Sequence, residues 1–229
     1  MRGGHRRAGR RAAGFIAVAM GCALTGGALA TSKSDEGSAQ RYYRLGQTQF
    51  EQGKTLQAIE SLKKSLEFDP KLAEAHDYLG VIYLQQSDPD RAVKHLRKAI
   101  DINPYFTEAH NTLGVAYNVL KKYDRALEEF EVALKDKTYP TPEKIHFNMG
   151  KLYTDRGMYP DAIRCFEQAL KGKPDYLNGL LGLGLAYKKS GRGDLAVQQF
   201  KKVVRLGPNS AEATEARQYL DGKVAQEGS

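Results

Sequence analysis

The sequence predicts an all-α solenoid, in which pairs of antiparallel helices stack one after another and end on a single capping helix. One observation behind this prediction is internal repetition. AEAHDYLGVIY at 73–83 returns as TEAHNTLGVAY at 107–117, a shift of 34 residues. The other is the fixed spacing of small residues and prolines within each copy of the unit. Repeats of this length are typical of stacked helical hairpins, which bury their apolar faces only against their neighbours.

Within each unit, a glycine recurs at one position of the expected first helix, with spacings of 34, 34, 36 and 34 residues. An alanine follows 12 residues later, and a large apolar residue stands four residues beyond it. The small residues let two helices approach closely, and the large one fills the contact. These positions hold Gly46, Gly80, Gly114, Gly150 and Gly184, then Ala58, Ala92, Ala126, Ala162 and Ala196, then Leu62, Leu96, Phe130, Phe166 and Phe200.

A proline stands 24 residues after the glycine in four units, as Pro70, Pro104, Pro174 and Pro208. Because proline cannot continue a helix, it is expected to end the second helix of the pair. The whole pattern resembles the tetratricopeptide repeat, over about three quarters of the chain. This resemblance implies a right-handed superhelical solenoid whose concave groove is lined by the first helices of the pairs.

Residues 1–30 have the composition of an export signal. MRGGHRRAGRR carries five arginines, and the uncharged run at 12–30 follows. Cys22 stands after Ala19, Met20 and Gly21, which favours a lipoprotein-type signal cleaved before Cys22 with acylation of that cysteine. Cleavage after Ala30, which would release a soluble protein, and an uncleaved membrane anchor remain open alternatives.

A polar segment, TSKSDEGSAQ, follows the signal, and residues 31–38 are predicted to form a flexible tether. The charge balance also changes here. The chain has a formal net charge of +8, but five of its 35 basic residues precede Cys22, which leaves only +3 for the remainder. That balance favours a surface of mixed sign over a nucleic acid-binding face, which would need clustered cations.

Five repeats are predicted after the tether, followed by a capping helix at 211–221 and a disordered tail at 223–229. Asp88 and Asp124 are expected to cap the second helices of repeats two and three. The repeats fill 39–222 together with the capping helix, and their expected bounds are 39–72, 73–106, 107–142, 143–176 and 177–210.

Repeat three departs from the pattern, because two residues are inserted and prolines stand at Pro140 and Pro142. Proline biases the residue before it towards extended geometry and stops a helix. An ordered, longer elbow is therefore expected between repeats three and four. Thr141 is expected to cap the next helix, with Pro142 at its first position.

The sequence contains no catalytic motif: there is no phosphate-binding loop, nucleophile elbow or HExxH. We therefore expect no enzymatic activity, no cofactor, no small-molecule substrate and no metal site. His76, His110 and His146 share one repeat position, but equivalent residues of stacked pairs lie about 10 Å apart, too far to share a zinc ion with bonds of about 2 Å. Cys165 is expected to be a packed thiol without an intramolecular disulfide partner.

The repeat register selects a set of first-helix residues that should face the groove. They mix apolar, aromatic and polar side chains, which suits an extended or helical segment of a partner protein. Lysine, asparagine and arginine do not occupy the positions of a carboxylate clamp, which disfavours a chaperone adaptor. The predicted groove residues are Tyr43, Gln47, Asp77, Val81, Gln85, Asn111, Val115, Asn118, Phe147, Lys151, Thr154, Leu181, Leu185 and Lys188.

The export signal, Cys22, the tether, the repeat number and the Thr138–Glu143 elbow together resemble the type IV pilus biogenesis/stability lipoproteins called PilW or PilF, including the Tgl-like members. The resemblance implies a pilotin. Such a protein sits in the inner leaflet of the outer membrane through its lipid, faces the periplasm and binds the secretin subunit. It thereby assists assembly of the pore used for type IV pilus biogenesis and motility.

Two alternatives remain open from the sequence. The chain could be a generic periplasmic scaffold for another envelope-assembly or polysaccharide-export complex. It could also be a non-catalytic subunit or regulator of an envelope enzyme. All three interpretations have a protein partner, and none involves nucleic acid.

Overall fold

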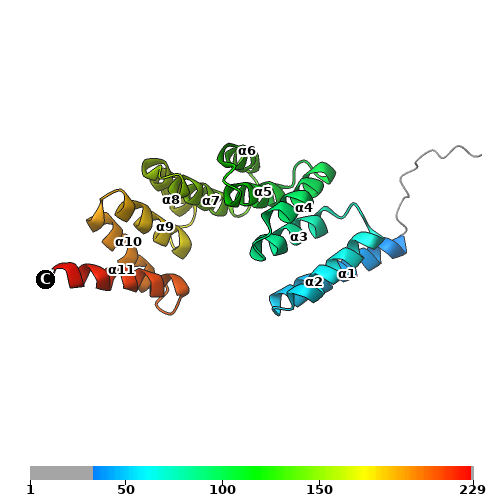
Figure 1. The fold of residues 1–229 in the computed structure, drawn as a ribbon, viewed down its shortest axis with the longest axis horizontal. Coiled ribbons are helices and arrows are strands. Elements are labelled where there is room, and N and C mark those ends of the chain that lie inside the picture. Colours follow the sequence, from blue (N-terminus) through cyan, green and yellow to red (C-terminus); the bar gives the residue numbers. More distant parts are fainter. Residues whose placement is uncertain (1–32, 228–229) are drawn as a thin grey trace, which may run out of the picture. The chain divides into compact units, whose positions relative to one another are not determined.

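The computed structural model describes residues 33–227, and these contain eleven α-helices and no strand (Figure 1). The all-helical prediction is confirmed. The first helices of the five pairs are α1 (Lys33–Glu51), α3 (Ala73–Gln85), α5 (Thr107–Val119), α7 (Pro142–Asp155) and α9 (Leu177–Lys189). The second helices are α2 (Thr55–Phe68), α4 (Pro89–Ile102), α6 (Tyr123–Ala133), α8 (Tyr159–Gly172) and α10 (Gly193–Leu206), and α11 (Ala211–Glu227) follows them.

Each pair closes where the repeat register places its glycine and its large apolar residue. A Cβ atom built on Gly80 would lie 2.5 Å from Cγ of Leu96, and one built on Gly184 would lie 2.5 Å from Cε1 of Phe200. The other three repeat glycines face their own predicted partners in the same way. The five repeat alanines are buried as well. The glycine therefore provides the space that the leucine or phenylalanine of the second helix fills.

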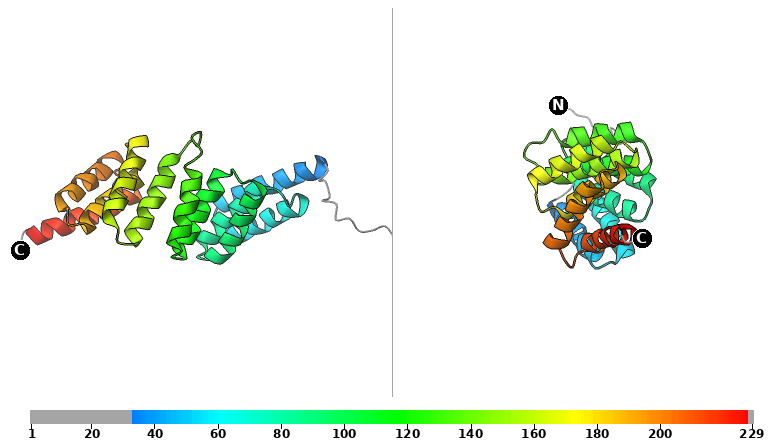
Figure 2. Two further views of the ribbon diagram at one scale, coloured as in Figure 1. Left: turned by 90° about the horizontal axis from the view of Figure 1, so that it is seen from above. Right: turned by 90° about the vertical axis from the view of Figure 1, so that its left-hand side faces the viewer.

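The second helices end where the prolines predict. Pro70, Pro104, Pro174 and Pro208 each stand two residues after the last residue of α2, α4, α8 and α10. The chain then turns into the next pair. The further views in Figure 2 show α11 beside the last pair, where it packs against both α9 and α10. A helix in this place covers the apolar face of the last pair.

Buried residues form two large clusters that meet near α7. The first runs from Ala39 in α1 to Leu152 in α7, and the second runs from Ala162 in α8 to Ala216 in α11. Tyr153 of α7 packs against both clusters. The close contacts between α6 and α7 are fewer than those between α4 and α5 or between α8 and α9. The joint between repeats three and four is therefore the looser one, and it coincides with the elbow.

Several local predictions need correction. Helix α1 begins at Lys33, so residues 33–38 are helical where a flexible tether was expected, and α11 continues to Glu227 through most of the expected disordered tail. The carboxylate of Asp88 caps α4 as predicted, since Oδ1 accepts a hydrogen bond from the backbone N–H of Arg91 at 3.1 Å. Asp124 instead lies within the first turn of α6.

Thr141 is the residue before α7, and Pro142 begins that helix, as expected. The Thr141 side chain makes no capping hydrogen bond. The export signal, Cys22 and the membrane-anchor alternative lie outside the described residues. Among the helices that are described, none combines the length and the apolar character needed to cross a membrane.

Candidate protein-binding surface

The predicted groove residues lie on α1, α3, α5, α7 and α9, and several of them hold neighbouring first helices together. The rings of Tyr43 on α1 and Tyr78 on α3 meet edge to face, with centroids 6.1 Å apart. Two joints further along, Asn148 on α7 donates a hydrogen bond from Nδ2 to Oδ1 of Asn111 on α5, at 3.0 Å. These side chains serve the stack itself as well as the surface, which the repeat register alone does not reveal.

Asp77 on α3 occupies the repeat position that Asn111 occupies on α5. Its Oδ1 atom is buried and has no hydrogen-bond partner among the described residues. Burial raises the pKa of Asp77 to about 7, and the nearby carboxylates of Glu108 and Glu74 add to this, against a hydrogen bond from Thr112. Burial thus favours the protonated, uncharged carboxyl group, which costs less to bury between repeats two and three.

Exposure divides the predicted residues into three groups. Gln85, Lys151 and Lys188 are exposed, and Leu181 is buried at 7% exposure within the second core cluster, so it is unavailable to a partner. The remainder are half-buried: Tyr43, Gln47, Asp77, Val81, Asn111, Val115, Asn118, Phe147, Thr154 and Leu185.

Two of these residues have a different role from the one expected. The ring of Phe147 packs between Phe166 on α8 and Tyr176, the residue before α9, with centroids 5.8 and 5.5 Å away, so it holds α7 against α8 and the start of α9. Gln85 lies one residue beyond the register of Asn118. Leu84 occupies that register and packs against the first core cluster.

A cavity of about 510 Å³, here called the elbow pocket, lies among α5, α6 and α7. It brings together three predicted groove residues, Val115, Asn118 and Lys151. Sequence reasoning missed the rest of its lining, which comes from the end of α5, from the turn after it, from α6 and from α7. The missed residues are Val119, Lys121, Tyr123, Phe130, Asn148 and Asp155. The two inserted residues of the elbow were the one sequence signal for an irregular joint here.

A second cavity of about 490 Å³ lies at the other end of the array, among α9, α10 and α11. Lys188 and Phe200 line it, and these are the repeat equivalents of Asn118 and Phe130 in the elbow pocket. The ammonium of Lys188 stands 4.2 Å from the ring centroid of Tyr219. Equivalent positions of the repeat therefore line a cavity both at the elbow and against α11.

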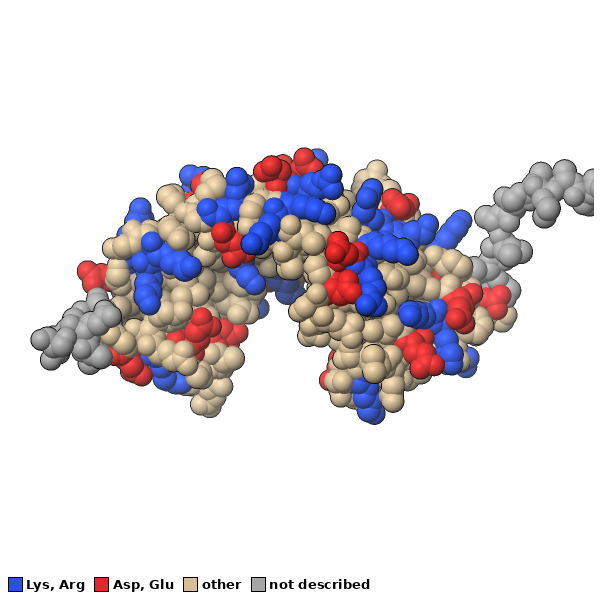
Figure 3. All heavy atoms as spheres, in the orientation of Figure 1, with Lys and Arg blue, Asp and Glu red and all other residues tan. Residues whose placement is uncertain are grey.

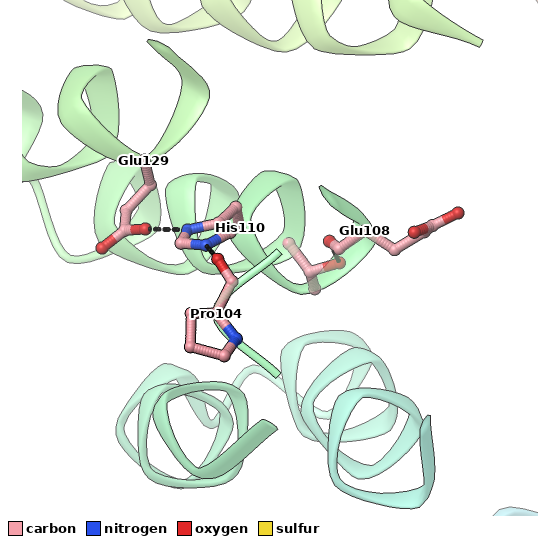
Figure 4. A network of polar contacts seen from close by, with 5 residues as sticks. Pro104, Glu108, His110 and Glu129 are labelled. Atoms are coloured by element: carbon pink, nitrogen blue, oxygen red, sulfur yellow. Dashed lines mark hydrogen bonds and ion pairs between the residues drawn. The ribbon is translucent and has the colours of Figure 1, made fainter. Parts of the chain in front are cut away.

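Three of the described histidines bond within the helix array. His76 and His95 approach each other within one helix pair, with Nδ1 atoms 3.1 Å apart. His110 bonds through Nδ1 to Glu129 at 2.7 Å and donates from Nε2 to the carbonyl oxygen of Pro104, 3.1 Å away (Figure 4). His76, His95 and His110 are therefore each engaged by a neighbouring side chain of their own helix pair. In the described part of the chain, no cluster of three or more histidine, cysteine or acidic side chains could hold a metal ion.

Cys165 is half-buried on α8 and free. Burial raises the pKa of its thiol to about 11, so the reactive thiolate is scarce at neutral pH.

The face of the molecule drawn in Figure 3 carries charges of both signs. In Figure 3, Lys and Arg gather over α4, α6 and α8, with carboxylates among them. This mixed surface agrees with the modest net charge that follows the N-terminal segment.

Family models for the tetratricopeptide repeat match four stretches of the chain. The model described as "TPR repeat" matches residues 46–87 and 150–191, and two models described as "Tetratricopeptide repeat" match 73–106 and 177–210. The stretches 73–106 and 177–210 coincide with the second and fifth helix pairs. The chain is a tetratricopeptide repeat protein. The elbow, and the residues on either side of it at 107–149, fall between the matched stretches, where the register is interrupted.

Solved structures share this fold over most of the chain. PilF of Pseudomonas aeruginosa is 24% identical with a TM-score of 0.69, covering 86% of this chain and 96% of its own. PilW, described as a widely conserved type IV pilus biogenesis factor, is 22% identical with a TM-score of 0.69, covering 82% and 94%. A MamA structure is 26% identical with a TM-score of 0.59, covering 76% and 94%.

Human tetratricopeptide repeat protein 13 is a curated relative at 36% identity over 66 residues. The match covers 27% of this chain and only 8% of the human protein, so it extends over a small part of that relative. The repeats make this chain a scaffold that binds other proteins, and tetratricopeptide scaffolds are typically non-enzymatic.

Proposed function

We propose that this tetratricopeptide repeat protein is a pilotin-like lipoprotein that assists assembly of an outer-membrane secretin for type IV pilus biogenesis. The observation that carries the proposal is the combination of a lipoprotein-type signal at Cys22 with the elbow after repeat three. The fold shared with PilF and PilW along nearly their whole length is compatible with it. In this role the first-helix surface binds the secretin subunit, while the lipid on Cys22 holds the protein at the inner leaflet of the outer membrane.

The deciding experiment is an immunoblot for heat-stable secretin multimers in cells with and without the gene. The proposal predicts loss of multimers while secretin monomer persists, and recovery when the gene is restored. Normal multimers together with normal pili would overturn it. A periplasmic scaffold for another envelope assembly would then be sought by co-purification.

Lipid anchoring has its own test. Cys22→Ala removes the only thiol that acylation could use in the signal, so the protein should leave the detergent phase and the membrane fraction. Cys165→Ala is the matched control, because that thiol is half-buried on α8 and is expected to leave membrane partitioning unchanged. Unchanged partitioning of the Cys22 variant would contradict lipidation without bearing on the fold.

A further inference from the structure

The elbow pocket exists because the stacking changes between repeats three and four. The distance in sequence from Gly114 to Gly150 is 36 residues, two more than at the other joints. The added chain lets α7 stand farther from α6, and the two helices pack less closely than their counterparts elsewhere. A space of about 510 Å³ opens on the first-helix surface, within the size range of ordinary ligand sites.

The floor of the pocket is apolar. Val115 and Phe130 lie at its base, and Phe130 is fully buried, so the pocket reaches the first core cluster. Val119 lies at the edge with 55% of its surface exposed, although it is a large apolar side chain. Tyr123 completes this side of the lining. An apolar side chain entering here would remove Val119 and the floor from water.

One polar group in the pocket is left without a partner. Asn118 donates from Nδ2 to Oδ2 of Asp155 at 2.9 Å. Its Oδ1 atom is buried and accepts no hydrogen bond from the described residues. A buried carbonyl oxygen without a donor is costly, so an N–H group from a bound segment would stabilise this arrangement.

The rim of the pocket is positively charged. A neighbouring cavity of about 610 Å³ shares Lys121 and Tyr123 with the elbow pocket and is lined further by Lys122, Arg125 and Arg156. Together with Lys151, these give five cations.

Two carboxylates, Asp155 and Asp124, stand among these five cations, which leaves the rim with a net excess of three positive charges. Asp155 is engaged by Asn118. Asp124 is 93% exposed and only 3.8 Å from Arg156, a weak pairing. The rim therefore attracts negative charge.

The backbone conformation of Lys121 gives a separate reason to assign a role to this side chain. Its φ is 58°, in the left-handed region, whereas the equivalent turns of repeats one, four and five use glycine with φ between 74° and 78°. Ser87 takes this conformation in repeat two. A lysine in this conformation costs free energy relative to glycine, and such costs are found where a side chain is needed for function.

We propose that the elbow pocket binds a partner segment in which apolar side chains are flanked by carboxylates. The apolar side chain fills the space above Val115, Val119 and Phe130. The flanking carboxylates meet the lysines of the rim, and a backbone N–H of the segment donates to Asn118. This inference rests on the proposed role in protein binding and adds the chemistry of the bound segment.

The test uses a fluorescein-labelled probe peptide with Asp-Asp-Leu-Phe-Asp-Asp at its centre and the whole protein. One control peptide replaces every Asp by Lys, and the other replaces Leu-Phe by Ser-Ser. Fluorescence anisotropy should show that the probe binds at least about tenfold tighter than either control. Its affinity should fall as salt rises from about 50 mM to about 500 mM. Equal binding of the three peptides, or no binding of the probe, would overturn the proposal.

Variants locate the binding. Lys121→Glu combined with Lys151→Glu should weaken probe binding by about tenfold or more, because both cations of the pocket reverse sign. The control, Lys63→Glu combined with Lys201→Glu, makes the same change of net charge at exposed positions on α2 and α10 and should bind normally. Equal weakening by both double variants would assign the effect to net charge and refute the pocket.

A milder variant tests the pocket in a protein that is expected to stay folded. Val119→Ser changes a side chain that is already half exposed, so the helices should stay folded by circular dichroism while the probe binds more weakly. The secretin immunoblot separates this inference from the proposed function. Lost secretin multimers in cells without the gene, together with an inert elbow pocket, would reject the pocket alone.

Discussion

At the scale of single residues, the repeat glycines set how closely the two helices of a pair approach. A Cβ atom on Gly114 would lie 2.5 Å from Cε1 of Phe130, whose side chain is fully buried, so the ring or the helix must shift to admit it. Gly114→Ala should therefore lower the free energy of unfolding by about 1–3 kcal/mol, measured by urea denaturation. The same change at Gly37, where nothing lies within 4 Å, should not destabilise. Equal effects at both glycines would contradict the packing described.

Residue chemistry also predicts sensitivity to acid in repeat two. Burial, with His76, Lys94 and Lys63 nearby, lowers the pKa of His95 to about 4, and burial and Lys98 lower that of His76. As pH falls from about 6.5 towards 4, the unfolded chain takes up protons that the folded chain does not. The free energy of unfolding should therefore fall over this range, and His95→Asn should reduce the loss, measured by urea denaturation at each pH.

His110 should change the free energy of unfolding with pH in the opposite direction. Burial lowers its pKa, but hydrogen bonds to Glu129 and to the carbonyl of Pro104 outweigh this, so its pKa lies above the ordinary value. Its contribution to stability is present at low pH and is lost as pH rises through the folded pKa. His110→Asn should therefore not reduce the acid loss. If it flattened the acid slope as much as His95→Asn does, the assignment to the His76–His95 pair would be wrong.

At the scale of elements, the start of α4 depends on one carboxylate. Asp88 accepts from the backbone of Arg91 through Oδ1 and from its guanidinium Nε through Oδ2, at 3.1 and 2.6 Å. Asp88→Ala should lower the urea midpoint, because a first-turn N–H loses its acceptor. Asp124→Ala should have a much smaller effect, because that side chain caps nothing and is 93% exposed. A larger loss from Asp124→Ala would show that the capping argument fails.

The elements also show how far the sequence predicts the structure. Helix pairs, glycine contacts and proline ends could all be read from the 34-residue period, because each follows from interactions within one unit. The tether was not predictable in the same way. Ser65 on α2 donates to the backbone carbonyl of Ala39 at 2.7 Å, and Ala39 is buried, so the early part of α1 is held by its partner helix. The prediction that residues 33–38 are flexible was based on their composition alone.

At the scale of the whole molecule, the two core clusters predict that stability is regional. In a stacked array each repeat depends on its neighbours, so damage should spread locally. Phe200→Ala should speed hydrogen exchange in α9, α10 and α11 more than in α3 and α4, since Phe200 belongs to the second cluster. Leu62→Ala, in the first cluster, should give the converse pattern. Uniform acceleration by both variants would indicate one cooperative unit instead.

By itself, the sequence determined the helical repeat, its register and the irregular joint, because these depend on residues close together in the chain or at a fixed period. Only the tertiary structure decided which first-helix residues are free for a partner. Leu181 and Phe147 are taken up by packing between repeats, and the two inserted residues open a pocket that joins Val119 and Lys121 to Lys151 across the elbow. The reason is physical. A surface depends on how neighbouring repeats are placed in space, and a two-residue change in chain length alters that placement without leaving a motif.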